Sequence, residues 1–210
     1  MSDANLETGC AAIVLAAGAS SRLGQPKQLL TVNGESLLHR TVRFAAEAGC
    51  APILVVLGFE SNRIQLEISD LETKIVINSD WQSGMGSSLR CGIDSLMKEC
   101  PAPQKTLLLL SDQAKLSSGI LVDLVRASAE GNPLITASRY AGRLGVPAIF
   151  QKQLYSELLK LEGDQGARSV IRHYLNQTTA VDFPDGAIDI DTPQDLISLE
   201  NISQDKSCRE

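Results

Sequence analysis

The stretch IVLAAGASSRLGQPKQLL, residues 13–30, decides how the rest of the chain is organised. It overlaps a short apolar run, residues 11–15, of the kind that forms a buried parallel strand. The run breaks at Gly18, and mostly small and polar residues follow as far as Lys27. Such a loop exposes backbone N–H groups with no large side chains in the way, and Arg22 and Lys27 add positive charge. The stretch therefore predicts a strand followed by a phosphate-binding loop.

The spacing of the glycines excludes two common phosphate loops. No G-x-G-x-x-G begins at Gly18, and the segment from Gly24 to Lys27 lacks the G-K-[ST] ending of a P-loop. The remaining alternative is an ordinary turn between a strand and a helix, which would not require both glycines and both cations at these places.

Composition and net charge limit the classes of protein to which this chain can belong. The chain has 210 residues, of which 43% are hydrophobic, and this suits one large domain with an ample core. A net charge of −6 argues against a nucleic-acid partner, because nucleic-acid-binding domains usually carry a basic face. The same charge does not exclude a nucleotide, whose phosphates need only a local cluster of cations.

Cysteine use and the first residues predict a cytoplasmic protein with no membrane contact. The five cysteines are scattered and form no C-x-x-C pair, so we expect neither a disulfide framework nor a zinc site. Residues 1–9 contain no apolar signal region, and no apolar run is long enough to cross a membrane.

Apolar periodicity predicts strands that alternate with helices. Strands are expected at residues 11–15, 52–57, 74–77, 106–110, 134–137, 146–150, 179–183 and 187–190. Helices are expected at residues 37–48, 61–69, 85–98, 120–125, 152–161 and 166–175, and from residue 193. The near-continuous apolar strands predict an α/β fold with a mostly parallel sheet covered on both faces. We expect one domain, residues 1–202, and a polar tail, residues 203–210.

Ligands of open α/β sheets bind beyond the carboxyl ends of the strands. The predicted strand at 106–110 delivers Asp112 to that edge, and the strand at 74–77 delivers Asn78. A carboxylate in this position suits Mg²⁺, which prefers oxygen ligands that include substrate phosphates. Asp112 as a turn or helix-capping residue is the alternative.

Six segments in order resemble those of one enzyme family. Leu15 to Lys27 matches L-A-A-G-x-S-x-R-[ML]-G-x-P-K, which resembles the signature loop of nucleotidyltransferases of the MobA-like and molybdenum-cofactor cytidylyltransferase group. The other five segments are N-x-x-W-x-x-G-M-x-x-S at 78–88, S-D-Q at 111–113, G-V-P at 145–147, G-D-Q-G-A-R at 163–168 and D-I-D-T-P at 189–193. The resemblance implies a single-domain Rossmann-like nucleotidyltransferase fold, with a mostly parallel mixed sheet and helices on both faces.

The resemblance also implies roles for individual residues. It implies catalytic roles for Arg22, Lys27 and Asp112, and nucleotide contacts at Leu15, Ala16, Ala17, Gly18, Lys27, Asn78, Gly84, Ser88 and Asp112. It implies Mg²⁺, or Mn²⁺ in its place, held by Asp112 and Asp191, and acceptor contacts at Gly145, Pro147, Asp164, Arg168 and Asp189. For Asp191 the alternative is the N-cap of a helix that begins at Pro193.

The chain departs from the family pattern at three positions. Leu23 stands in place of Met, Ala114 in place of Pro, and Val146 in place of a His that relatives commonly carry before Pro147. In the first loop, Ala17 gives the A-A-G form that implies cytidine, whereas guanine-using relatives tend to carry A-G-G.

The resemblance thus implies transfer of CMP from CTP to molybdopterin, with release of pyrophosphate. A molybdoenzyme or a chaperone is the downstream partner that it implies. A phosphate nucleophile is already ionised near neutral pH, so the reaction needs no general base. Two alternatives stay open: another acceptor such as a sugar 1-phosphate, or GTP as the donor, and a non-catalytic protein that binds and delivers the cofactor.

Overall fold

The central sheet has seven strands in the order β5-β4-β1-β6-β8-β7-β9. The computed structural model describes residues 9–20, 23–99 and 103–187. The strands are β1 Cys10–Ala16, β4 Ile53–Leu57, β5 Lys74–Ile77, β6 Lys105–Leu110, β7 Ile135–Tyr140, β8 Arg143–Gln151 and β9 Thr178–Asp182. Every neighbouring pair is parallel except those that involve β8, which is antiparallel to both β6 and β7. The predicted mostly parallel mixed sheet is confirmed.

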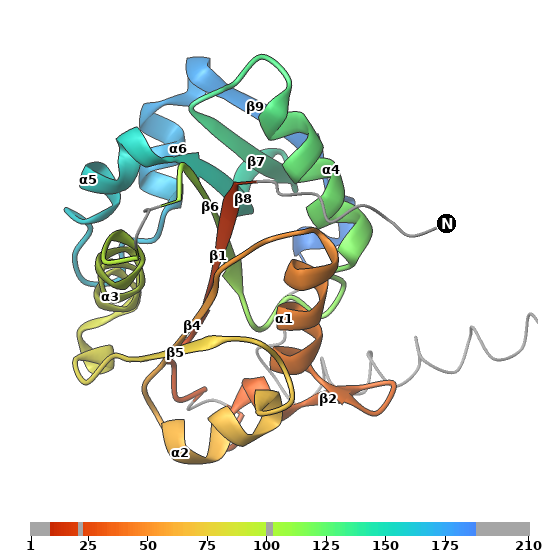
Figure 1. Ribbon diagram of the computed structural model, residues 1–210, viewed down its shortest axis with the longest axis vertical. Coiled ribbons are helices and arrows are strands. Elements are labelled where there is room, and N and C mark those ends of the chain that lie inside the picture. The colour runs from red at the N-terminus through yellow and green to blue at the C-terminus, as the bar shows by residue number, and fades with distance from the viewer. Residues whose placement is uncertain (1–8, 21–22, 100–102, 188–210) are drawn as a thin grey trace, which may run out of the picture.

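Helices cover both faces of this sheet, as predicted. Figure 1 shows α1 (Leu37–Glu47) and α4 (Ser118–Ala129) on one side. On the other side lie α3 (Met85–Met97), α5 (Tyr155–Leu158) and α6 (Arg168–His173). None of the helices in the described ranges is long and apolar enough to cross a membrane.

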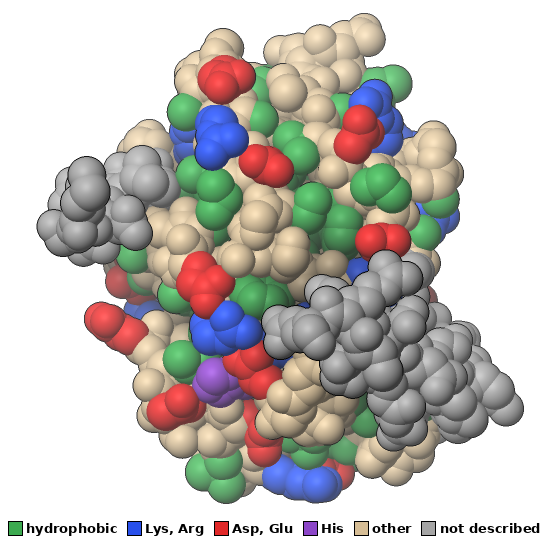
Figure 2. Space-filling model, turned by 90° about the vertical axis from the view of Figure 1, so that its right-hand side faces the viewer, with side chains coloured by type: hydrophobic (Ala, Val, Ile, Leu, Met, Phe, Trp, Pro, Cys, Tyr) green, Lys and Arg blue, Asp and Glu red, His purple; other side chains and the backbone are tan. Residues whose placement is uncertain are grey.

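A small hairpin precedes α1 and carries a charged cluster on the surface. Its strands are β2 (Thr31–Val32) and β3 (Glu35–Ser36), and the Ser36 hydroxyl caps α1 by accepting from the His39 backbone N–H. Acidic and basic side chains gather around a histidine on this face in Figure 2. His39 Nδ1 lies 2.6 Å from Glu35 Oε1, and Arg43 binds the same carboxylate.

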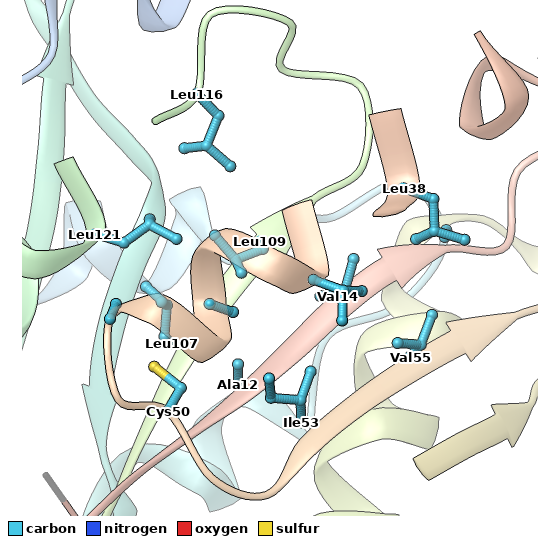
Figure 3. Close-up of a cluster of buried hydrophobic side chains, with 14 of the residues drawn as sticks. Ala12, Val14, Leu38, Cys50, Ile53, Val55, Leu107, Leu109, Leu116 and Leu121 are labelled. Carbon is cyan, nitrogen blue, oxygen red and sulfur yellow. The ribbon is translucent and has the colours of Figure 1, made fainter. Parts of the chain in front are cut away.

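The side chains on the two faces of each central strand pack into two separate hydrophobic cores. Ala12 and Val14 of β1 point to the α1 and α4 side, and Figure 3 shows them packed with Leu38 and Leu109. Their neighbour Ile13 points to the core of α3, α5 and α6. Because both faces are buried, these strands require apolar residues at every position, which explains the continuous apolar runs in the sequence.

The direction of the strands brings the ends of β1, β4, β5 and β6 to one edge of the sheet. Because β8 runs the opposite way, its first residues lie at that same edge. Its pairing with β6 runs from Lys105↔Gln151 to Leu108↔Ala148, so the residues before Ala148 extend toward the carboxyl end of β6. Loops from both halves of the chain therefore meet at this edge.

Several predicted elements differ in extent from those observed. The predicted helix at 61–69 is α2 (Ser61–Ile64) followed by a 3₁₀ helix, Gln65–Ile68. The helix at 152–161 is a 3₁₀ turn, Lys152–Leu154, followed by α5. The strands expected at 134–137 and 146–150 extend toward each other as β7 and β8, and the turn between them is two residues, Ala141 and Gly142, with φ of 47° and 68°. Both φ values are positive, as in the tight hairpin turns that match the twist of β7 and β8.

The predicted strand at 187–190 is wrong at its first residue. Ala187 ends a 3₁₀ helix, Pro184–Ala187, that is closed by a hydrogen bond from the Gly186 N–H to the Phe183 carbonyl. A side chain at position 186 would collide with the Phe183 ring, so glycine permits this turn. Residues 188–190 and the helix predicted from residue 193 lie outside the described part of the chain.

Three of the cysteines, Cys10, Cys50 and Cys91, lie in the described ranges. The first two are buried in the core shown in Figure 3, where they act as small apolar side chains.

Candidate active site

A cavity of about 390 Å³ opens beyond the carboxyl ends of β1 and β6. It gathers nine of the residues predicted for the site: Leu15, Ala16, Ala17, Gly18, Lys27, Gly84, Ser88, Asp112 and Asp164. The other lining residues are Ser20, Gln28, Trp81, Gln82, Met85, Leu110 and Ser111. Segments that are up to about 150 positions apart in the sequence thus form one hollow.

The loop after β1 is pinned from both sides by hydrogen bonds to its backbone. The Gln28 side-chain amide donates to the carbonyls of Ala16 at 2.8 Å and Gly18 at 3.0 Å. The Phe59 N–H donates to the carbonyl of Ala17, between them, at 3.1 Å. Gln28 is itself buried, so this clamp has little freedom to move. The first part of the loop, residues 16–18, is therefore held in one shape before any ligand arrives.

The cationic side chain of the loop meets the carboxylate at the end of β6. Lys27 Nζ lies 3.4 Å from Asp112 Oδ2, and both side chains are partly buried. The Lys27 backbone is held as well, because its N–H donates to the Ser20 hydroxyl at 3.1 Å. The second oxygen of Asp112, Oδ1, is buried and has no hydrogen-bond partner among the described residues. A buried carboxylate oxygen without a donor is suited to a cation or to a ligand that brings one.

Asn78 supports the cavity wall and does not line it. Its side-chain amide donates to the hydroxyls of Ser87 at 2.9 Å and Ser88 at 3.0 Å, and its Oδ1 accepts from the Asp80 N–H. All three of the residues that share these amide hydrogen bonds are buried. This network fixes the first turn of α3 against the loop that follows β5.

The loop that carries Gly163 and Asp164 reaches the cavity through a contact between two glycines. Gly84 has φ of 98°, and a Cβ on it would lie 2.5 Å from the backbone of Gly163. The Gly86 N–H donates to the Gly163 carbonyl at 2.9 Å. This close approach accompanies the placement of Asp164 in the cavity wall.

Trp81 both lines the cavity and packs against a neighbouring aromatic ring. It lines the cavity, and its ring packs edge-on against Phe59 with centroids 5.7 Å apart. A side chain at Gly58 would overlap the Trp81 ring, so glycine at the end of β4 is what lets the indole approach.

Two of the predicted acceptor residues, Gly145 and Pro147, lie on β8 beside the cavity and not in its wall. The carbonyl of Val146 accepts from the Gln113 side chain at 3.1 Å and from the Tyr140 hydroxyl at 2.9 Å. The Pro147 carbonyl accepts from the Ser138 hydroxyl at 2.8 Å. The pairing register of β7 and β8 shifts at this point, between Ala137 and Ser138. Such β-bulges are common next to functional sites.

Arg168 lines a separate hollow of about 240 Å³ between the β7–β8 hairpin and α6. The remaining predicted residues, Arg22, Asp189 and Asp191, lie outside the described part of the chain. Within the described ranges, no group of three or more His, Cys, Asp or Glu side chains could hold a metal ion. The two-carboxylate metal site therefore stays a prediction.

Gln28 is the structural residue that the sequence pattern did not reveal. Its neighbour Lys27 ends the phosphate-loop pattern, and glutamine after lysine is by itself an unremarkable polar residue. Of the other lining residues, Ser20, Trp81, Gln82, Met85 and Ser111 fall inside segments that the resemblance marks, and Leu110 ends the predicted strand at 106–110.

Sequence comparison identifies relatives of this chain. The profile of the MobA-like NTP transferase domain matches residues 12–179. The chain is 30% identical to nicotine blue oxidoreductase of Paenarthrobacter nicotinovorans, over 89% of this chain and 94% of that protein. It is 26% identical to the purine catabolism protein PucB of Bacillus subtilis, over 87% and 92% of the two chains.

Solved structures show the same arrangement. Rv0371c of Mycobacterium tuberculosis superposes with a TM-score of 0.78 at 29% identity, covering 90% of this chain and 96% of its own. A nucleotidyl transferase from Methanothermobacter shares the fold, with a TM-score of 0.77 at 21% identity over 94% of this chain and 98% of its own. With the matched profile spanning most of the sequence, the chain belongs to the family of MobA-like NTP transferase domains.

Proposed function

We propose that this protein transfers CMP from CTP to molybdopterin and releases pyrophosphate. The observation that carries the proposal is the cavity at the carboxyl edge, where Lys27, Asp112 and the Ala16–Gly18 backbone come together from separate strands. Family membership supports a nucleoside triphosphate as one substrate. The identity of the base and of the acceptor is the further step that we propose.

For this reaction the protein must align the two substrates and stabilise the negative charge on the phosphate oxygens. A phosphate oxygen of the acceptor attacks the α-phosphorus of CTP, the new P–O bond forms, and the bond to the β-phosphate oxygen breaks as pyrophosphate leaves. The Lys27 ammonium, with Arg22, would stabilise the negative charge that develops on these oxygens. The clamp of Gln28 on Ala16 and Gly18 would keep the backbone N–H groups of the loop aimed at the phosphates.

Asp112 fits a divalent cation, since one of its carboxylate oxygens is buried without a hydrogen-bond partner among the described residues. Mg²⁺, or Mn²⁺ in its place, would supply positive charge that neutralises the triphosphate and orients it. Asp112 and Asp191 are the residues that we propose as its ligands. A second structure of Rv0371c, whose alignment with this chain gives 26% identity, is a complex with manganese, and it supports the proposal of a divalent cation.

The cytidine preference rests on Ala17. This residue is 5% exposed, and its carbonyl is already bound by the Phe59 N–H, so the loop has little room to withdraw. A methyl group at this position would leave space for a pyrimidine and less for the larger purine.

One relative favours a second candidate function. The protein from Paenarthrobacter nicotinovorans is named an oxidoreductase, and it aligns with nearly the whole of this chain. An enzyme of that class would move electrons from a reduced dinucleotide to an organic acceptor, and it would release no pyrophosphate.

The test is pyrophosphate release from each of the four ribonucleoside triphosphates, with and without molybdopterin and with Mg²⁺ present. We expect release with CTP that depends on molybdopterin and is at least tenfold faster than with GTP. Release with a sugar 1-phosphate and not with molybdopterin would reassign the acceptor. Molybdopterin binding without any pyrophosphate would indicate a delivery protein. Oxidation of NADH in the presence of a dye, without pyrophosphate, would indicate the oxidoreductase.

A further inference from the structure

The turn after β6, which carries Asp112 into the cavity, is held by side chains from both sides. On one side, the buried Gln113 side chain donates to the Val146 carbonyl of β8 at 3.1 Å. On the other side, Nη1 of Arg40 in α1 donates to the Ala114 carbonyl at 3.3 Å. The backbone that positions Asp112 therefore depends on contacts with β8 and with α1.

The contact with Arg40 satisfies a carbonyl of a buried residue. Ala114 is 3% exposed and packs against Leu30 and Leu37. A buried carbonyl needs a hydrogen-bond donor, and Arg40 is the donor that this carbonyl meets among the described residues. A charged donor forms a stronger hydrogen bond than a neutral one. Loss of the guanidinium would leave this carbonyl unsatisfied and allow the turn to shift.

Ion pairing does not account for the charge of Arg40. In the described ranges Arg40 forms no ion pair, and its guanidinium lies over the Phe44 ring, 5.4 Å from the centroid. The side chain is partly buried, and this burial lowers the pKa of Arg40 below its ordinary value. Arg43, one turn further along α1, lies over the same ring but pairs with Glu35 and Glu47. A partly buried charge without a carboxylate costs free energy, so the contact with the turn is what distinguishes Arg40 from Arg43.

The same helix also contacts the segment that follows Lys27. The Leu37 N–H, at the start of α1, donates to the Leu30 carbonyl at 2.8 Å. Leu30 lies three residues after Lys27, and both leucines pack against Ala114. The Lys27 loop and the Asp112 turn are therefore supported by one helix, and the Arg40 hydrogen bond joins that helix to the turn.

We propose that Arg40 is a positioning residue for the transfer reaction, which holds the Ala114 carbonyl and so keeps the Asp112 carboxylate where it meets Lys27 and the triphosphate. The proposal rests on the proposed function for the identity of the reaction. Arg40 is not among the residues that line the cavity, so it acts through the turn. A shift of about 1 Å in a catalytic group lowers a rate by about a hundredfold, so a contact outside the cavity is sufficient for a large effect.

The first test is amide hydrogen exchange in the protein without nucleotide. Arg40→Met keeps an apolar stem beside the Phe44 ring and removes the donor. The protected amides of the turn are those of Ser111 and Leu116, which donate to the carbonyls of Leu15 and Gln113. We expect both to exchange about tenfold faster in Arg40→Met, because the turn opens more often when one of its anchors is lost. Amides of β4, residues 53–57, should be unaffected.

The second test is turnover with CTP and the acceptor that supports pyrophosphate release. Arg40→Met should lower kcat about tenfold and leave KM for CTP within about twofold of the wild type, because alignment is lost and nucleotide contacts are kept. Arg40→Gln, whose amide ends two bonds short of the guanidinium nitrogen, is the second variant and should show the same changes.

Arg43→Met is the matched control for both tests. It lies on the same helix and over the same ring, and it loses its ion pairs with Glu35 and Glu47 without touching the turn. Its melting temperature should fall at least as far as that of Arg40→Met. Exchange at Ser111 and Leu116, and kcat, should match the wild type.

Four outcomes would overturn the proposal. They are unchanged exchange in both Arg40 variants, an unchanged kcat in both, an equal loss of kcat in Arg43→Met, or a KM for CTP that rises as much as kcat falls. The last result would make Arg40 a contact of the nucleotide itself. Faster exchange in a protein that releases no pyrophosphate with any acceptor would refute the proposed function and leave the hold of Arg40 on the turn standing. Normal wild-type turnover that Arg40→Met does not change would refute the role of Arg40 alone.

Discussion

Lys27 Nζ lies 3.4 Å from Asp112 Oδ2, although the two residues are 85 positions apart in the sequence. Lys27 belongs to the loop after β1 and Asp112 to the turn after β6, so their ion pair joins two separate segments that line the cavity. Each group holds the other in place, and a change in either one alters the charge that the triphosphate meets.

Lys27→Ala should lower turnover by about a hundredfold while the fold persists. The lost ammonium is one transition-state donor, and such a donor contributes about 3 kcal/mol. Pyrophosphate release measures the rate, and circular dichroism measures the fold. Lys160→Ala, at an exposed lysine of the surface, is the control and should retain full activity. Near-full activity of Lys27→Ala would mean that the loop does not bind the reacting phosphates.

Asp112→Asn should raise the Mg²⁺ concentration required for half-maximal rate and leave the melting temperature nearly unchanged. The carboxylate oxygen that has no partner among the described residues is the atom that the amide weakens as a ligand. Asp191→Asn should act in the same direction if it shares the metal. As an N-cap, Asp191 replaced by Ala would instead cost about 1 kcal/mol of stability. If Asp191→Asn does not change the Mg²⁺ concentration required for half-maximal rate, Asp189 becomes the next candidate ligand. Asp123→Asn on α4 is the control and should leave that concentration unchanged.

Ala17→Gly should relax the preference for CTP over GTP. The substitution removes a methyl group from the cavity wall, and the extra space favours the larger base. The ratio of the kcat/KM values for CTP and GTP is the measurement, and we expect it to fall at least fivefold. An unchanged ratio would mean that other residues, and not Ala17, select the base.

Gly84→Ala should lower the free energy of unfolding by about 1–3 kcal/mol, the cost of a side chain in a strained backbone conformation. The new Cβ would lie 2.5 Å from the Gly163 backbone, so the two loops would also have to separate. Gly119→Ala in α4 is the matched control, because its nearest neighbour is 3.8 Å away. Alanine in that helix should raise stability, by up to about 1 kcal/mol. Denaturant unfolding that shows no loss in Gly84→Ala would contradict the close contact.

His39 should make stability depend on pH near neutrality. Burial lowers the pKa of His39, but the carboxylates of Asp70 and Glu35 outweigh it and raise the pKa above its ordinary value. A raised pKa in the folded state stabilises the protein below about pH 6.5, and the gain is lost as the pH rises through the folded pKa. The difference in melting temperature between wild type and His39→Asn should therefore be largest near pH 5 and shrink by pH 9. Asp70→Asn should reduce that difference in part. A difference in melting temperature that grows with pH would contradict a raised pKa of His39 in the folded state.

The sequence was sufficient for the sheet and for most of the cavity, for a physical reason. Strands buried on both faces need unbroken apolar runs, and the polar residues that end those runs mark the edge where ligands bind. Gly18 and Asp112 were therefore found from local pattern alone. The tight turn at Ala141 and Gly142, and the clamp of Gln28, depend on contacts with residues distant in the sequence. No local pattern encodes such contacts.

The position of Arg168 illustrates the same limit. The resemblance implies an acceptor contact at Arg168, and the structure places this residue in a hollow separate from the main cavity. That it shares a hollow with Arg143 and Arg172 follows from the packing of α6 on β8, which brings together residues from separate motifs.

The reversed direction of β8 makes one half of the site replaceable. Its last four residues pair with β6 and keep the register of the sheet, whereas its first residues pair with β7 alone. A hairpin lengthened or shortened at Ala141 and Gly142 would reshape the surface beside the cavity and leave the β1 and β6 loops where they are. Under the proposed function, evolution could thus exchange the acceptor of such a protein while its donor stays the same.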